Sequence, residues 1–294
     1  MKRALTLAAA LMVLTLAPGA RADADSATRY YLSLGDSLAV GFQPNGDVGH
    51  GYAEQLHAML AATDPKLELV KFGCGGESTT GMRFGTQPAT TVLSCTVPHR
   101  YPKGTQLAEA VSFLQAHKNK VALVTIDIGA NDLSRVNAQG NAVNCLLQPA
   151  GCAAQVAAME QNLAAILAEL KAAAGPDVPM VGMTYYDPFA PLCVSNPSLL
   201  FVCSRVDAVN AVLVDTYAAA DVLVADVAGA FENDVLVSAA THVCSWTWFC
   251  AQGDIHPNAT GYAVVAGEFL AAIPPSASGE AELASRAQST EVER

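Results

Sequence analysis

The chain has 294 residues, of which 52% are hydrophobic and 15% are charged, and its formal net charge at pH 7 is -11. So hydrophobic a composition excludes an intrinsically disordered chain. The acidic balance argues against nucleic acid or an anionic membrane as a partner, because both need clustered lysine and arginine side chains.

The first 22 residues have the pattern of a secretory signal peptide. Lys2 and Arg3 precede an apolar run over residues 4–17, and small residues suited to cleavage follow at positions 20–22. Cleavage near Ala22 would leave 272 residues with a net charge of -14, because the leader holds three basic residues and no acidic ones. The apolar run is short for a membrane span, so we expect a secreted protein without a stable membrane anchor.

The mature chain is expected to form one domain. Residues 30–275 are long enough to bury one substantial core, and residues 23–29 form a short leading segment. Residues 276–294 are polar, alternate in charge and lack a core pattern. We expect this last segment to be a flexible tail with no role in the chemistry.

Apolar strands and amphipathic helices alternate along the domain. The predicted strands are residues 30–34, 67–72, 121–128, 178–185 and 222–227, and the predicted helices are residues 51–62, 153–174, 203–219 and 258–273, with a further helix that begins after Thr105. Residues 38–49, 81–103 and 135–151 are predicted to be mainly irregular. The alternation predicts an α/β fold with a parallel sheet between helices, in which ligands bind at the carboxyl ends of the strands.

All eight cysteines lie in the mature chain, and an even number in an exported protein indicates disulfides. Short loop closure favours pairing between neighbours, although other pairings stay open. The favoured pairs are Cys74 with Cys95, Cys145 with Cys152, Cys193 with Cys203, and Cys244 with Cys250. The chain has no Cys-x-x-Cys pair, so we expect no zinc or other metal site.

Four short polar motifs occur at predicted strand ends or before a predicted helix. They are Gly35-Asp36-Ser37-Leu38, Gly73-Cys74-Gly75-Gly76-Glu77-Ser78, Gly129-Ala130-Asn131-Asp132 and Asp254-Ile255-His256-Pro257. A serine hydroxyl is a weak nucleophile, which needs a base to accept its proton and donors to hold the oxyanion that it creates. Each motif alone is weak evidence, but their order and placement favour a joint catalytic site.

Together these motifs resemble those of the SGNH hydrolase family, also called GDSL esterases and lipases. The resemblance spans about residues 30–273 and implies a three-layer α/β/α sandwich with a central, mostly parallel, flavodoxin-like sheet. It implies that Ser37 is the nucleophile and His256 the base, with Ser37, Gly76 and Asn131 forming the oxyanion hole. No cofactor is implied.

The third member of the expected triad departs from the family pattern. The acidic residue of the family usually lies three positions before the histidine, where this chain has Gly253, and Asp254 lies only two before. Either Asp254 reaches the far nitrogen of His256, which we favour, or a backbone carbonyl orients the ring.

Other polar and aromatic residues near the motifs have structural interpretations. Asp36 is expected to shape the turn by bonding the backbone, and Asp127 lies in an apolar strand where a carboxylate needs an unidentified partner. Tyr185, Tyr186 and Phe189 could line an acyl or aromatic pocket, as could the cluster Trp246-Thr247-Trp248-Phe249, or they could equally be core or loop packing. The position of the cluster just before the His256 loop slightly favours a place in the pocket wall.

The sequence favours a secreted serine hydrolase, expected to be monomeric, that cleaves small-molecule or lipid carboxylic esters through an acyl-enzyme on Ser37. The substrate range includes lysophospholipid-like lipids. A carbohydrate acetylesterase of the same family is the first alternative, since it would use the same residues. A non-catalytic secreted binding protein that retains the fold is the alternative from another class.

Overall fold

The computed structural model describes residues 28–85, 101–136, 142–148 and 152–274. Two predicted segments lie outside the described residues, namely the leader and the tail beyond Pro274. Cys95, which is the predicted partner of Cys74, lies outside them as well.

Five parallel strands form the central sheet in the order β2-β1-β3-β6-β7. The strands are β1 (Arg29–Gly35), β2 (Leu67–Lys71), β3 (Val121–Asp127), β6 (Met180–Met183) and β7 (Leu223–Ala225). The last five residues of β1 and of β3 are buried, as expected for strands that helices cover on both faces. This order is that of a flavodoxin-like doubly wound sheet, so the predicted fold class is confirmed.

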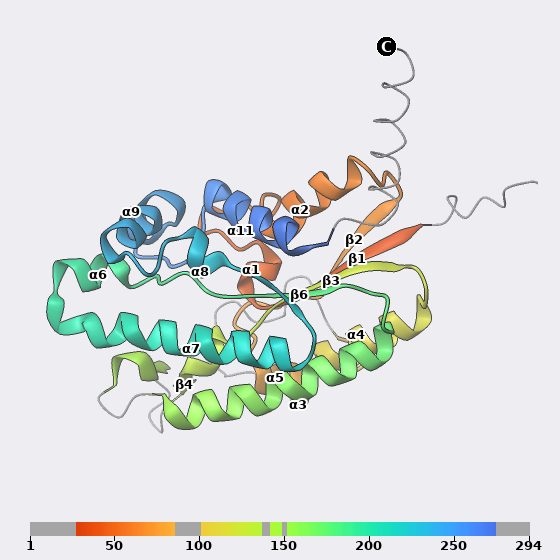
Figure 1. Ribbon diagram of the computed structural model, residues 1–294, viewed down its shortest axis with the longest axis horizontal. Helices are drawn as coiled ribbons and strands as arrows, with labels where there is room; N and C mark the ends of the chain where they lie inside the picture. Colours follow the sequence, from red (N-terminus) through yellow and green to blue (C-terminus); the bar gives the residue numbers. More distant parts are fainter. Residues whose placement is uncertain (1–27, 86–100, 137–141, 149–151, 275–294) are drawn as a thin grey trace, which may run out of the picture.

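Helices cover both faces of the sheet (Figure 1). On one face α2 (Tyr52–Ala61) packs against α11 (Ala259–Ala272), and on the other α5 (Ala153–Ala174) packs against α4 (Gln106–Ala116) and α7 (Leu200–Ala219). Each face has its own hydrophobic core. The Thr105 side chain caps α4 by accepting from Ala108 N, as its sequence position predicted.

Several segments contain more regular structure than the sequence indicated. The additional elements are α3 (Thr79–Phe84), β4 (Ser134–Val136), β5 (Ala142–Asn144), the short 3-10 helices η1 (Ala130–Leu133), η2 (Cys145–Leu147) and η3 (Pro197–Leu199), α6 (Ala190–Ser195), α8 (Val227–Ala230), α9 (Leu236–Trp246) and α10 (Phe249–Gln252). All of them except the 11-residue helix α9 have six residues or fewer, so hydrophobic periodicity cannot identify them. Helix α7 begins at Leu200, three residues before its predicted start, because η3 leads directly into it.

The segment Pro197–Ala219 is long and apolar enough to cross a membrane by length and composition alone. In the structure one side of α7 is buried, including Val206, Val209 and Leu213, and the helix packs against α5. Core helices of water-soluble proteins pass the same composition test, so this segment is explained by packing.

Three disulfides join neighbouring elements within the described residues. They are Cys145–Cys152, Cys193–Cys203 and Cys244–Cys250, the same neighbours that short loop closure favours. The first links η2 to the start of α5, the second links α6 to α7, and the third links α9 to α10.

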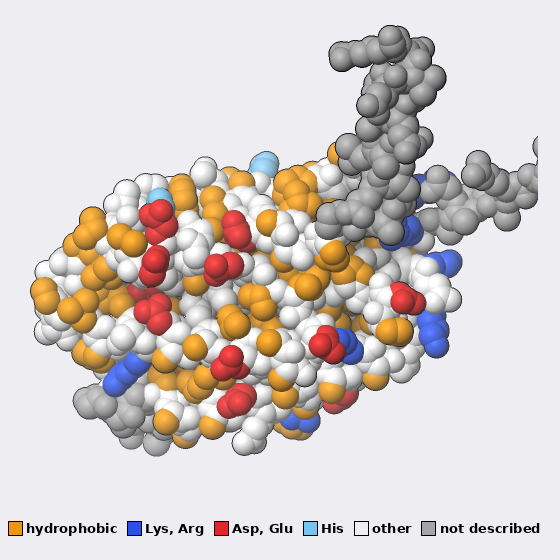
Figure 2. All heavy atoms as spheres, viewed as in Figure 1, with side chains coloured by type: hydrophobic (Ala, Val, Ile, Leu, Met, Phe, Trp, Pro, Cys, Tyr) orange, Lys and Arg blue, Asp and Glu red, His pale blue; other side chains and the backbone are white. Residues whose placement is uncertain are grey.

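Charge is distributed unevenly on the face shown in Figure 2. Acidic side chains are scattered over the region of α7, α8 and α9, whereas most of the visible basic side chains lie toward the end of the molecule where β1 begins. This face therefore offers no broad basic surface beside α7 to α9.

Candidate active site

The turn between β1 and α1 (Ser37–Val40) exposes Ser37 to a cavity. Asp36 caps α1 through its Oδ1 atom, which accepts from Leu38 N at 2.9 Å, as the turn-shaping interpretation predicted. Gly35 has a φ of 135°, and a Cβ atom there would lie 2.1 Å from Asp127 O, so glycine is required. Because Ser37 is the first residue of α1, its N–H has no acceptor within the helix and is available to a ligand.

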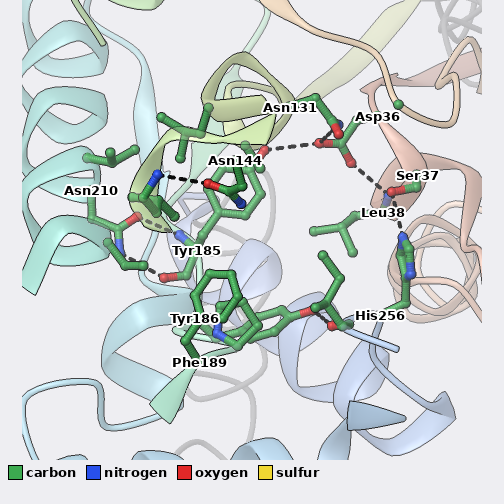
Figure 3. Close-up of a pocket in the computed structure, with 18 residues that line it drawn as sticks. Asp36, Ser37, Leu38, Asn131, Asn144, Tyr185, Tyr186, Phe189, Asn210 and His256 are labelled. Carbon is green, nitrogen blue, oxygen red and sulfur yellow. Dashed lines mark hydrogen bonds between the residues drawn. The ribbon is translucent and has the colours of Figure 1, made fainter. Parts of the chain in front are cut away.

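His256 comes from the other end of the chain and meets Ser37 at this turn. Its Nε2 atom lies 2.8 Å from Ser37 Oγ, and Figure 3 shows the two side chains facing each other. The loop that carries His256 is fixed on both sides, since Trp248 N donates to His256 O and Asn258 caps α11. The Phe42 ring packs against the imidazole in a T-shaped arrangement, with 4.6 Å between centroids.

Asp254 contacts the far nitrogen of His256. The Oδ1 atom lies 2.7 Å from Nδ1 and also accepts from His256 N at 2.9 Å. Gly253 permits this turn with a φ of 69° in the left-handed region. A spacing of two residues therefore suffices, because the carboxylate folds back onto its own loop. Of the two orienting groups that the sequence left open, the carboxylate is the one in contact.

Gly76 and Asn131 line the same cavity as Ser37. Glu77 N donates to Cys74 O and closes a tight turn in which Gly76 has a φ of 76°. Asn131 lies in η1 after β3, and its Nδ2 donates to Asp36 Oδ2 at 3.2 Å, which leaves the second amide hydrogen for a ligand.

The loops of Gly76 and Asn131 are tied together by Asp132. Its carboxylate accepts from Thr79 N at 2.8 Å and from Thr79 Oγ1 at 2.6 Å. Burial raises the pKa of Asp132, while these hydrogen bonds act in the opposite direction. Asp132 is therefore a structural brace.

The partner that the sequence could not name for Asp127 is Tyr52. The Tyr52 hydroxyl donates to Asp127 Oδ1 at 2.5 Å, while Asp36 N and Ala39 N both donate to Oδ2 at 3.2 Å. The fully buried Asp127 carboxyl group thus holds both ends of the turn that carries Ser37.

Asp36 and Asp127 are coupled by their common burial. Burial raises the pKa of Asp36, and burial together with the negative charge of Asp36 raises the pKa of Asp127 well above its ordinary value. The two carboxyl groups therefore ionise less readily than exposed aspartates, and their hydrogen bonds to Tyr52, Asn131 and the backbone stabilise the charge that remains.

A cavity of about 180 Å³ extends from Ser37 and His256 to α7. Its wall is mainly apolar and includes aromatic residues that the sequence singled out, together with residues from η1, η2 and α7. Its lining residues include Leu133, Leu146, Tyr185, Tyr186, Phe189, Val206, Val209 and Asn210.

The second aromatic cluster lies elsewhere. Trp246 stacks on His242 and packs edge-on against Phe231, and Trp248 Nε1 donates to Gln43 Oε1 at 3.4 Å. Neither tryptophan lines the cavity, so the suggestion that this cluster forms the pocket wall was wrong. The cluster instead contacts the loop that presents His256, since Trp248 N donates to His256 O and Asn258 N donates to Trp246 O.

Two functional neighbours, Tyr52 and Asn210, were not singled out from the sequence. Asn210 binds the backbone of Tyr185 with both ends of its amide, accepting from N at 2.8 Å and donating to O at 2.7 Å. The buried aspartate in β3 signalled that Tyr52 or an equivalent donor must exist, whereas nothing in the helical pattern of α7 marked Asn210.

Among the described residues, Asp187, Cys193 and Cys203 are close enough together to hold a metal ion. The two cysteines are joined to each other in a disulfide, which removes them as thiolate ligands. This cluster therefore does not fit a metal site.

The sequence profile of the GDSL-like lipase/acylhydrolase family matches residues 33–264 of the chain. No curated protein is similar enough in sequence to count as a relative.

Solved structures support the fold. The lipase Lip_vut3 from a goat rumen metagenome is 18% identical, with a TM-score of 0.55, and the match covers 83% of this chain and 97% of that chain. A single-residue variant of Axe2, an acetyl xylan esterase from Geobacillus stearothermophilus, is 19% identical with a TM-score of 0.53, and the match covers 84% of this chain and 97% of that one.

A third neighbour, phospholipase A1 from Streptomyces albidoflavus NA297, is 20% identical with a TM-score of 0.50, and the match covers 84% of this chain and 100% of that one. At such low identity these likenesses show the fold alone, whereas the profile match spans most of the chain and all four polar motifs. The chain therefore belongs to the GDSL-like lipase/acylhydrolase family, whose members are ester hydrolases.

Proposed function

We propose that the protein hydrolyses carboxylic esters through an acyl-enzyme on Ser37. The observation that carries this proposal is the 2.8 Å separation between Ser37 Oγ and His256 Nε2, with Asp254 on the opposite side of the imidazole ring. His256 accepts the Ser37 proton as the oxygen attacks the ester carbonyl, and returns it to the departing alcohol. Asp254 holds the ring and stabilises the imidazolium.

Three donors hold the oxyanion in this mechanism: Ser37 N, Gly76 N and Asn131 Nδ2. In a second half-reaction water, activated by His256, attacks the acyl carbonyl, and Ser37 Oγ departs with the proton that His256 returns. Asp36 and Asp127 stay outside the proton transfers and keep the turn of Ser37 in place through its backbone N–H groups.

An esterase or lipase that acts on acyl chains fits the cavity better than a carbohydrate acetylesterase. The walls beyond Asn131 are formed largely by leucine, valine and aromatic side chains. An acetyl group would leave most of this apolar space empty, and a sugar would find few polar partners there.

Labelling with a fluorophosphonate tests the nucleophile directly, because the reagent needs an activated serine. We expect one label per chain, on Ser37, and hydrolysis of nitrophenyl acetate that the Ser37→Ala variant loses. Acetylated xylan, measured in parallel, should be a poor substrate. A folded wild-type protein that takes no label would favour the non-catalytic binding function and rule out this proposal.

We also propose that the protein is secreted with cleavage near Ala22. The three disulfides support an oxidising compartment. Amino-terminal sequencing of the protein from the culture medium should find a chain that starts near Asp23. Recovery of the protein only inside cells, with Met1 retained, would contradict this.

A further inference from the structure

The far end of the cavity, beyond Ser37 and His256, is an apolar recess between η2 and α7. Leu146 of η2 and Val206 and Val209 of α7 line it, and all three side chains are at most 6% exposed. Figure 3 shows α7, which carries Asn210, across the cavity from Ser37 and His256. A departing alcohol must face His256 to receive its proton, so the acyl group of the same ester points toward this recess.

Most of the polar groups at this end already have partners. Both ends of the Asn210 amide bind the Tyr185 backbone, the Tyr185 hydroxyl donates to Asp36 Oδ2 at 3.4 Å, and Asn144 Oδ1 accepts from Leu146 N. A polar substrate group placed here would lose its hydrogen bonds to water and would find few new partners. A hydrocarbon chain meets no such cost.

The walls of the recess are anchored covalently. The Cys145–Cys152 disulfide starts at the residue before Leu146, and the Cys193–Cys203 disulfide ends one helical turn before Val206. Arg205 also bridges the two walls, since its Nη1 atom donates to Leu146 O and Gln148 O. The recess therefore cannot widen easily, and its length limits what fits.

We propose that this recess is a closed acyl site that accepts straight chains of about six to eight carbons, with Val206 and Val209 as the residues that determine the limit. The inference rests on the proposed ester hydrolysis and adds its substrate class. The upper size limit follows from the volume of the whole cavity, about 180 Å³, part of which lies beside Ser37 and His256. For comparison, an apolar cavity of about 150 Å³ accommodates the six carbons of benzene.

A chain-length series of nitrophenyl esters, from acetate to palmitate, tests the limit in the wild-type mature protein. We expect kcat/KM to rise by about 100-fold or more from acetate to octanoate, because each buried methylene favours the bound state. It should then fall by about tenfold or more at dodecanoate, because the extra carbons overpack the recess.

Two variants at one position should move this optimum in opposite directions. Val209→Phe fills the recess, so the octanoate to acetate ratio of kcat/KM should fall by about tenfold or more. Val209→Ala enlarges it, so the optimum should move toward longer chains. Val214→Phe is the matched control, because Val214 lies on the same helix but is 38% exposed, and its ratio should equal that of the wild type.

The outcomes separate the two proposals. A flat or acetate-preferring profile, with Ser37 still labelled by a fluorophosphonate, would overturn the acyl site and leave the ester hydrolase intact. Calorimetry of octanoate binding to the Ser37→Ala variant gives an answer even without turnover. Octanoate should bind at least about tenfold more tightly than acetate, and Val209→Phe in that background should remove the difference. Equal binding of the two acids would also overturn the acyl site.

Discussion

The two ends of the cavity are built from different kinds of sequence. At the Ser37 end, four short motifs follow strands or precede a helix, and almost every polar atom of the site has a specific partner. At the α7 end, valine, leucine and aromatic side chains come from segments with no motif, namely η2, the segment between β6 and α6, and the middle of α7. The first end is organised by hydrogen bonds and charge, and the second by packing and disulfides.

This contrast separates reactivity from selectivity. Hydrogen bonds are directional, so the Ser37 end tolerates few changes without losing rate. Apolar packing depends on volume, so changes at the α7 end should alter which ester is preferred while the chemistry continues. Mutations at the Ser37 end should therefore leave the preference among esters unchanged, and mutations at the α7 end should leave the chemistry at Ser37 unchanged.

The largest effect is expected for His256→Ala. Removing the base should lower kcat/KM for nitrophenyl acetate by about 10⁴-fold or more, because Ser37 then keeps its proton during attack. His50→Ala is the matched control, since its side chain is 67% exposed and it contacts Asp47 away from the site. Steady-state kinetics measure kcat/KM for both variants, and circular dichroism checks that both are folded. Equal values of kcat/KM for the two folded variants would refute the role of His256.

Asp254→Asn should produce the next largest loss, about 10²- to 10⁴-fold in kcat. The amide can hold the loop by accepting from His256 N, but it cannot stabilise the imidazolium by charge. Comparing kcat of this variant with that of the wild type decides whether the Asp254 carboxylate, only two residues before His256, takes part in catalysis. Almost unchanged turnover would mean that orientation alone suffices and that the carboxylate is a loop cap.

Asn131→Ala should lower kcat by about 100- to 1000-fold while KM changes little, because the lost donor acts mainly on the oxyanion. The ratio of kcat/KM between octanoate and acetate esters should stay that of the wild type, since the acyl recess is untouched. Near-normal turnover would exclude Asn131 from the oxyanion hole. A changed chain-length ratio would show that the two ends of the cavity are not independent.

Asp127→Asn tests the buried support of the nucleophile turn. An amide presents a donor where the carboxyl group accepts from Tyr52, Asp36 N and Ala39 N, so the variant should lose about 2 to 3 kcal/mol of unfolding free energy. Tyr52→Phe removes a single donor from the same group and should lose about 1 kcal/mol. Urea unfolding measures both, and a loss in Asp127→Asn no greater than in Tyr52→Phe would contradict this arrangement.

The last prediction concerns the pH dependence of stability and Asp187, an ionisable group beside the apolar end. Burial raises its pKa to about 6, aided by the charge of Asp207 and opposed by the hydrogen bond from Phe189 N. Between pH 4 and pH 6 the folded chain keeps a proton that the unfolded chain has lost, so this group lowers stability as pH rises through that window and contributes no further change above it.

Asp187→Asn should remove this dependence. The stability of the variant relative to the wild type should therefore increase by about 2 kcal/mol from pH 4 to pH 7, as measured by urea unfolding at each pH. Parallel curves for the two proteins would show that Asp187 titrates as an exposed aspartate does. The activity profile with chain length should not change, because the neutral side chain keeps the bond to Phe189 N.

The strands and long helices were predictable because their hydrophobic patterns are long enough to be read. Residues 121–128 are mainly apolar and β-branched, which is typical of a strand covered on both faces. They form the central strand β3, whose bounds agree with the prediction within one residue. The short elements around η2 and α6 were not predictable, since a few residues carry no period and their structure depends on packing and disulfides. The 11-residue helix α9 was missed.

By itself the sequence determined the succession of strands and helices along the chain and the four polar motifs, because each depends on residues close together in the chain. It also determined the candidate site residues, which are Ser37, Gly76, Asn131 and His256. The tertiary structure alone decided that Asp254 reaches His256, that Tyr52 is the partner of Asp127, and that α7 closes the cavity opposite Ser37. The contact of Tyr52 with Asp127 and the position of α7 join segments far apart in the chain, and the contact of Asp254 with His256 depends on the conformation of the loop that carries both, so no local sequence pattern encodes them.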